Sequence, residues 1–178
     1  SSTSRGLGDV YKRQILSFAS YAFVILAMFR LFRINYFNPI VKIFATYLEP
    51  ISKSIFFFLN PLLAALALAF LLQFVSLYLA YSSGYEPLTL LFISIINVIN
   101  SCFRILFYCV IGSVILSWVA PGNNHPLLQI VEEMSGAILQ PIRKFVPPMG
   151  GLDFTPIIGL MLLNLINTSF IQIISSMV

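Results

Sequence analysis

Residues 28–44 (MFRLFRINYFNPIVKIF) and residues 115–131 (ILSWVAPGNNHPLLQIV) share one organisation when they are aligned on Pro39 and Pro126. In both, an apolar segment ends in a polar turn that closes with Asn-Pro or His-Pro, and an amphipathic segment follows. The chain therefore contains an internal repeat. Both copies also include apolar stretches long enough to cross a bilayer, which takes about 20 residues, so the repeated unit is a piece of a membrane protein.

The composition supports this interpretation. Hydrophobic residues make up 59% of the 178 residues and charged residues only 9%, and the mean hydropathy is +0.95. These values lie far from those of soluble domains. Because each span takes roughly 20 residues, we expect an all-α integral membrane protein with four transmembrane helices in two repeated helix pairs, each pair with an amphipathic interfacial helix.

The chain divides into three parts. Residues 1–14 (SSTSRGLGDVYKRQ) are polar and meet an apolar run without transition. A short native tail would explain them, but we favour a non-native leader from a tag, a vector or adapter read-through. We assign residues 15–80 to a first, degenerate repeat and residues 88–178 to a second. Beyond the leader, seven basic residues face five acidic ones, an excess too small to predict contact with nucleic acid.

Apolar runs and turn signals give the expected elements. Asn38 and Asn60 precede prolines, as helix N-caps do, and His125 is interpreted as a cap or loop residue. Arg30 lies where the first span would leave the hydrocarbon, and we expect its side chain to reach the headgroups. The expected spans are 15–32, 61–80, a segment within 88–118, and 157–174 with Thr155-Pro156 as its cap; the expected interfacial helices are 39–49 and 127–139.

Basic residues near span ends predict the orientation, because Lys and Arg accumulate on the cytoplasmic side. The loops at 33–53 and 120–155 share one face if there are four spans, and both carry basic residues, whereas the 82–87 connection carries none. We therefore place both repeat loops in the cytoplasm and both termini outside.

A polar seam is predicted inside the membrane. Arg104 lies within the third span, and Asn97 and Asn100 precede it on the same helical face. Charged residues inside a span are costly and usually face the bundle interior or a hydrated path. The seam could line an ion or solute path, or its hydrogen bonds could hold the bundle or a homo-oligomer together; if the helix starts late, Arg104 lies at the interface. Possible partners on other spans are Gln73, Asn164 and Asn167.

The sequence offers no candidate for enzyme chemistry. Cys102 and Cys109 are seven residues apart on one apolar span, which favours a structural role over a disulfide or metal site. His125 has no second ligand at a zinc-like spacing. We find neither a phosphate-binding loop nor a nucleophile with an adjacent base, and we predict no catalytic residue, cofactor or metal.

Residues 140–156 read QPIRKFVPPMGGLDFTP, and the corresponding part of the first copy is about eight residues shorter. Prolines fix the approach of this loop and glycines allow close backbone contact, so we expect it to fold back on the bundle, with Asp153 able to pair with Arg143. The basic pair Arg143 and Lys144 should attract anionic lipid headgroups or dock a partner. The predicted contact residues are Gln140, Pro141, Arg143, Lys144, Pro147, Pro148, Gly150, Gly151 and Asp153.

This motif, preceded by Ser117-Trp118-Val119, resembles the YggT family, which is called YlmG in Gram-positive bacteria and plastids. The resemblance extends from about residue 15 onward. It implies a small bacterial inner-membrane protein with two similar halves and no assigned enzyme chemistry, linked to division-site or nucleoid organisation and, in some members, to osmotic or ion homeostasis. The first copy departs from the family pattern at residues 54–58 (SIFFF), where members often repeat the basic motif.

Two functions follow as expectations. The first is a non-enzymatic membrane organiser or assembly factor, and the alternative is a component of an ion or osmolyte transport pathway. The expected partners are membrane lipid, a membrane or division-related protein, and a second copy of the chain.

Overall fold

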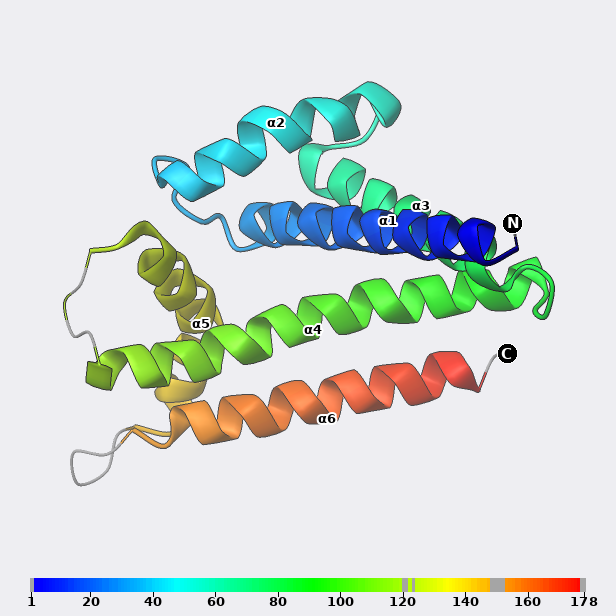
Figure 1. The fold of residues 1–178 in the computed structure, drawn as a ribbon. Helices are drawn as coiled ribbons and strands as arrows, with labels where there is room; N and C mark the ends of the chain where they lie inside the picture. Colours follow the sequence, from blue (N-terminus) through cyan, green and yellow to red (C-terminus); the bar gives the residue numbers. More distant parts are fainter. Residues whose placement is uncertain (1, 120–121, 123, 148–152, 177–178) are drawn as a thin grey trace.

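The computed structural model describes residues 2–119, 122, 124–147 and 153–176, with side chains from residue 8 onward. Within these residues the chain forms six α-helices and no strand (Figure 1). Four of them, α1 (from Gly8), α3, α4 and α6, are long and apolar enough to cross a membrane, which confirms the predicted all-helical fold. The helices are α1 (Ser2–Leu31), α2 (Pro39–Ile55), α3 (Pro61–Tyr81), α4 (Pro87–Val119), α5 (Pro126–Phe145) and α6 (Thr155–Ser175).

Three helix starts follow the sequence signals closely. The side-chain oxygens of Asn38 and Asn60 accept hydrogen bonds from backbone amides two and three residues later, at 3.0 and 2.8 Å. His125 Nδ1 accepts from the Leu127 amide at 3.2 Å. Each cap satisfies an amide that has no partner within its helix, and a proline follows at the first helical position.

The first helix begins earlier than predicted. Residues 2–14, which the sequence sets apart as a leader, continue α1 without a break. The end of this segment packs on α3, because Arg13 donates to the Tyr81 hydroxyl at 3.3 Å and its carbonyl accepts from Ser76 at 3.1 Å. A polar run gives no signal for a span, but a formed helix extends at little cost through residues that tolerate it. A non-native origin for this segment stays a prediction.

Both amphipathic helices end later than predicted. Pro50 lies inside α2 and Pro141 inside α5, where each proline removes one backbone hydrogen bond. The helices nevertheless continue to Ile55 and Phe145. In α2 the turn after the proline is fixed by packing, since Ser52 is fully buried. Arg143 and Lys144 therefore belong to the last turn of a helix and not to a loop.

Among the described residues, the most extensive contact between two helices is that of α1 with α3. Ala64, Ala65 and Ala69 of α3 are completely buried, so the two backbones approach closely. Ser20 of α1 uses this proximity to donate to the Ala69 carbonyl at 2.7 Å. Small residues and hydroxyl groups are the usual contacts between membrane helices, where lipid is as apolar as leucine.

The two repeat loops meet each other. Asn38 Nδ2 donates to the Pro126 carbonyl at 2.7 Å, and the Asn35 amide donates to Glu133 at 2.9 Å. The aligned N-terminal ends of α2 and α5 are therefore in direct contact. Figure 1 shows both chain termini and the α3–α4 turn at the opposite end of the molecule.

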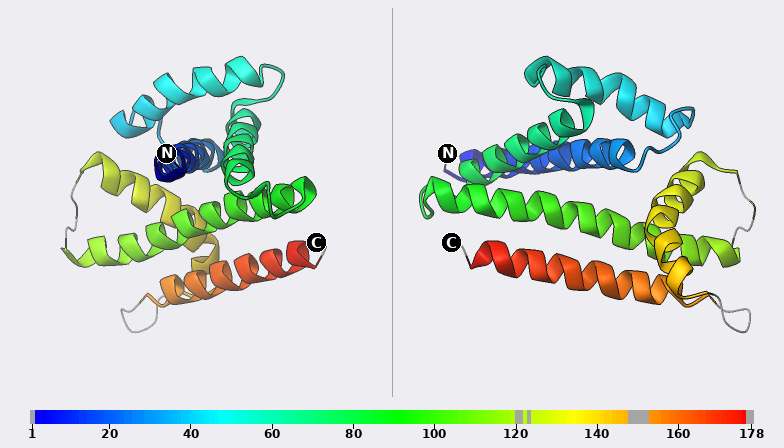
Figure 2. Two further views of the ribbon diagram at one scale, coloured as in Figure 1. Left: turned by 45° about the vertical axis from the view of Figure 1, so that its right-hand side comes forward. Right: turned by 180° about the vertical axis from the view of Figure 1, so that it is seen from behind.

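The two helix pairs are arranged differently. In the left view of Figure 2, α1 is seen nearly end-on while α4 and α6 extend across the picture, so the first pair crosses the second. Within the described residues α6 contacts only α4 and α5. Within this part of the chain α6 therefore has fewer neighbouring helices than α1 or α3, and the candidate site lies between α6 and α4.

Candidate functional site

A polar cavity of about 210 Å³ lies between α4 and α6. Asn100, Arg104 and Tyr108 of α4 line one wall, and Asn164 and Asn167 of α6 line the other, with apolar side chains between them. One hydrogen bond joins the two walls, from Asn167 Nδ2 to Asn100 Oδ1 at 3.0 Å. The structure therefore brings together most of the polar residues of the predicted seam.

Asn97 and Gln73 are not part of this cavity. Neither residue is among those that line it, and α3, which carries Gln73, makes no contact with α6 within the described residues. Gln73 therefore lies apart from the α4–α6 cavity, and a contact between Gln73 and the Asn97 end of the seam stays a prediction. Asn97 lies one turn before Asn100 on α4 and is partly buried.

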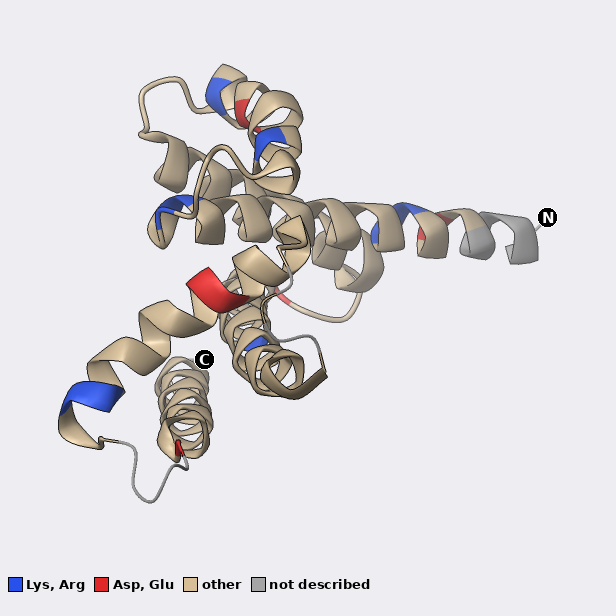
Figure 3. Cartoon of the chain, turned by 90° about the vertical axis from the view of Figure 1, so that its left-hand side faces the viewer, with Lys and Arg blue, Asp and Glu red and all other residues tan. Residues whose placement is uncertain are grey.

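Arg104 lies deep within its helix. Since α4 begins at Pro87, Arg104 is about 25 Å from the helix start at 1.5 Å per residue. This boundary does not agree with the hypothesis that α4 starts late and places Arg104 at the membrane interface. Arg104 is the one charged residue of α4, and Figure 3 shows that the ribbon of the protein is mostly free of basic and acidic positions.

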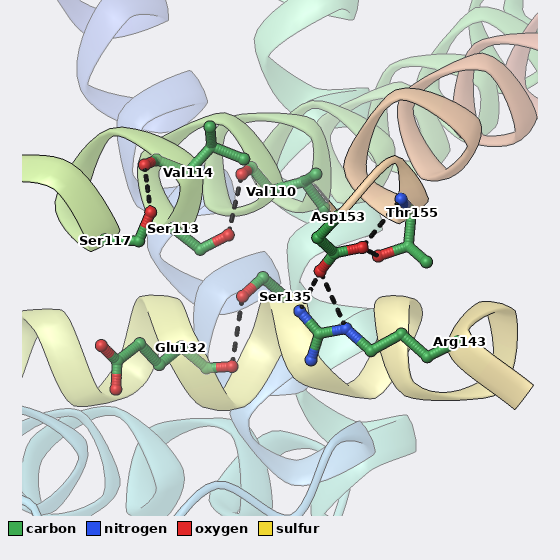
Figure 4. Close-up of polar contacts among 9 residues, drawn as sticks. All are labelled: Val110, Ser113, Val114, Ser117, Glu132, Ser135, Arg143, Asp153 and Thr155. Carbon is green, nitrogen blue, oxygen red and sulfur yellow. Dashed lines mark hydrogen bonds and ion pairs between the residues drawn. The ribbon is translucent and has the colours of Figure 1, made fainter. Parts of the chain in front are cut away.

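A second polar arrangement joins the end of α5 to the start of α6 (Figure 4). Arg143 donates to Asp153 Oδ2 through Nη2 at 2.8 Å and through Nε at 3.1 Å. Asp153 Oδ1 accepts from the Thr155 amide at 3.0 Å and also from its hydroxyl. The predicted pairing of Asp153 with Arg143 is present in this structure, which ties the family-motif segment to α5.

The role of Thr155 differs from the sequence expectation. Thr155 is the first residue of α6 and not its cap, and the carboxylate of Asp153 accepts a hydrogen bond from its backbone amide. These hydrogen bonds, chiefly the one from the Thr155 side chain, together with the nearby Arg143 guanidinium, lower the pKa of Asp153. The carboxylate is therefore ionised at neutral pH, and its contribution to stability disappears only as the pH falls through this lowered pKa.

A crevice of about 530 Å³ lies beside this ion pair. Its polar wall includes Ser113 and Ser117 of α4, Glu132 of α5, and the pair Arg143 and Asp153. Trp118, which is 84% exposed, borders it. The crevice lies at the end of the molecule where both repeat loops are found.

The remaining motif residues are divided between described and undescribed segments. Gln140 and Pro141 are exposed positions within α5, and Pro147 is exposed just after it. Lys144 is also exposed. Pro148, Gly150 and Gly151 lie outside the described residues, so the prediction that the whole loop folds back on the bundle is supported only through Asp153.

Sequence reasoning missed one charged cluster. Glu49 of α2 is only 15% exposed at its side chain and forms ion pairs with Arg30 of α1 and Lys53 of α2. Arg30 also lies over the Tyr36 ring, 5.3 Å from its centroid. The i, i+4 spacing of Glu49 and Lys53 signals one of these pairs; the pair with Arg30 forms only because α2 folds back on α1.

The described residues contain no group of three or more His, Cys, Asp or Glu that could hold a metal ion. Cys102 and Cys109 are unpaired thiols in α4.

The fold and these sites define a class: a multi-pass helical membrane protein built from a duplicated unit of span, amphipathic helix and span. The CCB3/YggT family model matches residues 92–174. An uncharacterized protein of Pseudomonas aeruginosa is 36% identical over 168 residues, which cover 88% of this chain and 85% of that protein. The chain belongs to the YggT family.

Other relatives agree with this assignment. An uncharacterized protein of Haemophilus influenzae is 25% identical over 167 residues, or 92% of this chain and 91% of that protein. The uncharacterized protein YggT of Escherichia coli K12 is 32% identical over 72 residues, or 40% of this chain and 38% of that protein. No solved structure matches the chain.

Proposed function

We propose that this protein is a non-enzymatic organiser or assembly factor of the bacterial inner membrane, with both repeat loops in the cytoplasm. In this role it docks a segment of another protein that is connected with cell division or nucleoid organisation. The observation that carries the proposal is the crevice between α4, α5 and α6. Its hydroxyl and charged walls suit a polypeptide better than an acyl chain, because polar groups in contact with hydrocarbon lose hydrogen bonds to water.

Two side chains strengthen this assignment. Trp118 at the crevice and Phe145 at the end of α5 are 84% and 85% exposed, and large aromatic residues supply much of the energy of protein interfaces. Lys144, next to Phe145, would attract anionic headgroups with about 1 kcal/mol and hold this region at the membrane surface. Lipid contact and partner docking thus use neighbouring parts of one surface.

Site-specific photocrosslinking in native membranes tests this proposal. A benzoylphenylalanine that replaces Phe145 is expected to capture a division or nucleoid protein, and the additional change Ser117→Trp should abolish capture by filling the crevice. The control replaces Phe57, which is equally exposed beyond α2, and should not capture that protein. Capture of lipid alone, or equal capture from both positions, would contradict the docking function.

The polar cavity favours a second candidate function, a part in an ion or solute pathway across the membrane. Arg104 and the asparagines give this cavity hydrophilic walls inside membrane-spanning helices, which is a common feature of transport pathways. Purified protein in liposomes should then show solute flux that falls about tenfold or more in Arg104→Ala or Asn100→Leu, because each change removes polar wall groups. Lys42→Ala on α2 is the control and should not alter the flux. Flux no greater than in empty liposomes would rule this function out.

A further inference from the structure

We propose that the cavity between α4 and α6 binds a small monovalent anion, such as a halide, through the Arg104 guanidinium and the surrounding side-chain N–H and O–H groups. This inference requires neither of the functions proposed above, because an anion can be bound without being transported and without a docked partner.

The first argument is charge. Arg104 is the sole charged residue in α3, α4 and α6, and no ion pair among the described residues includes it. Three of the six acidic side chains are paired with other cations, and Glu133 accepts from a loop amide. The other two acidic side chains also lie outside the cavity. The six acidic residues are Asp9, Glu49, Glu86, Glu132, Glu133 and Asp153. An unneutralised guanidinium inside a span is unfavourable by about 3 kcal/mol or more, and a bound anion removes this penalty.

The second argument is the chemistry of the wall. A guanidinium presents five N–H donors, each asparagine amide two, and Tyr108 one hydroxyl proton. Since no carboxylate lines the cavity and Arg104 would repel a cation, the described lining selects for negative charge. The cavity therefore fits an anion and disfavours Na⁺ or K⁺.

A third observation is a polar atom without a partner. Asn167 Oδ1 is buried and accepts no hydrogen bond, while Nδ2 of the same amide donates to Asn100. If both amides are turned by 180°, Asn100 donates to Asn167 Oδ1 and the partnerless atom becomes a donor. In either orientation one amide atom at the cavity wall requires a further group, either a water molecule or an anion.

The volume of the cavity and its position along the membrane-spanning helices limit which anion can bind. A volume of about 210 Å³ accommodates a halide together with a few water molecules, since one water takes up about 30 Å³ in the liquid. A phospholipid phosphate offers the same negative charge but belongs to the headgroup layer, whereas Asn164 and Asn167 lie near the middle of α6. A free anion that enters from water is the source that we favour.

Thermal unfolding in a neutral detergent provides the test, with sodium chloride compared with sodium gluconate at equal ionic strength. Chloride should raise the unfolding temperature in a saturable manner, because a ligand that binds only the folded state stabilises it. The shift should vanish in Arg104→Met. In Asn164→Leu, which retains the charge, the half-saturating chloride concentration should rise about tenfold, as the loss of one hydrogen bond to a charge would give. Lys42→Met, which removes an exposed cation on α2, should respond as the unchanged protein does.

Several outcomes would overturn the inference. Equal unfolding temperatures in chloride and gluconate, or a chloride response that survives in Arg104→Met, exclude an anion site at this position. Chloride dependence that disappears when anionic phospholipid is added would instead assign the site to a lipid phosphate. If Arg104→Met changes the oligomeric state in light scattering and chloride has no effect, a carboxylate or carbonyl group of a second copy neutralises Arg104. Should Arg104→Met fail to fold, Arg104→Lys and Asn164→Leu still compare affinities on folded protein.

Discussion

Replacement of Ala65 by leucine is expected to lower the unfolding temperature in detergent by about 2 to 12 °C. Ala65 has no exposed surface and lies one helical turn before Ala69 of α3, whose carbonyl accepts from Ser20 of α1. Three extra carbon atoms must push the helices apart, and overpacking of this kind typically destabilises by about 1–3 kcal/mol, with about 2–4 °C per kcal/mol for a chain of this size. Separation of the backbones also weakens the hydrogen bond from Ser20 to the Ala69 carbonyl.

The matched control is the same substitution two residues away. Ala67 lies on another face of α3 and lines an apolar hollow against α4, so the larger side chain of Ala67→Leu has space. Its unfolding temperature should remain within about 2 °C of the original, as expected for a change that neither overpacks nor buries a polar group. If Ala65→Leu were as stable as Ala67→Leu, close packing of α1 and α3 could not be what holds the first helix pair together.

The second large effect is expected for Glu49→Gln. Glu49 is mostly buried between α1 and α2 and neutralises both Arg30 and Lys53. Loss of its charge leaves Arg30, at the end of a membrane span, without a counterion. Breaking a fully buried pair costs about 3–5 kcal/mol, and the partial exposure of both cations reduces this to about 1–3 kcal/mol here. Chemical or thermal unfolding in detergent measures the loss.

A double-mutant cycle isolates the ion pair. Arg30→Gln combined with Glu49→Gln should be more stable than the sum of the two single changes predicts, because the second change removes the uncompensated charge. Glu132→Gln, an exposed position without an ion pair in the described residues, should alter stability by less than about 0.5 kcal/mol. Additive effects in the cycle would show that the pair contributes nothing.

Local patterns in the sequence were sufficient to locate most helix ends. Asn38, Asn60 and His125 cap the helices that the sequence assigns to them, because capping depends on a side chain and amides only two or three residues apart. The same reasoning misplaced the ends of α2 and α5. Proline predicts a break from local geometry alone, whereas contacts with distant residues hold the following turn in place.

In the candidate sites, too, the sequence predicted some contacts and the tertiary structure decided others. The spacing of Asn100 and Arg104 placed both on one face of a span, and the motif around Arg143 and Asp153 suggested their pairing, since ten residues of chain keep them near each other. Gln73 could equally have joined the seam according to the sequence. Its absence from the α4–α6 cavity follows from the position of α6 against α4 and α5, which no pattern in the chain specifies.

The amino-acid sequence alone established that the chain is a duplicated, all-helical membrane protein, because span length, apolar composition and caps are properties of consecutive residues. Tertiary structure decided which polar groups meet: Arg30 with Glu49, Asn38 with Pro126, and Asn100 with Asn167. It also left Arg104 without a counterion among the described residues. These pairings depend on how whole helices cross. Because lipid contacts every apolar helix face equally well, the sequence pattern does not specify which faces pack together.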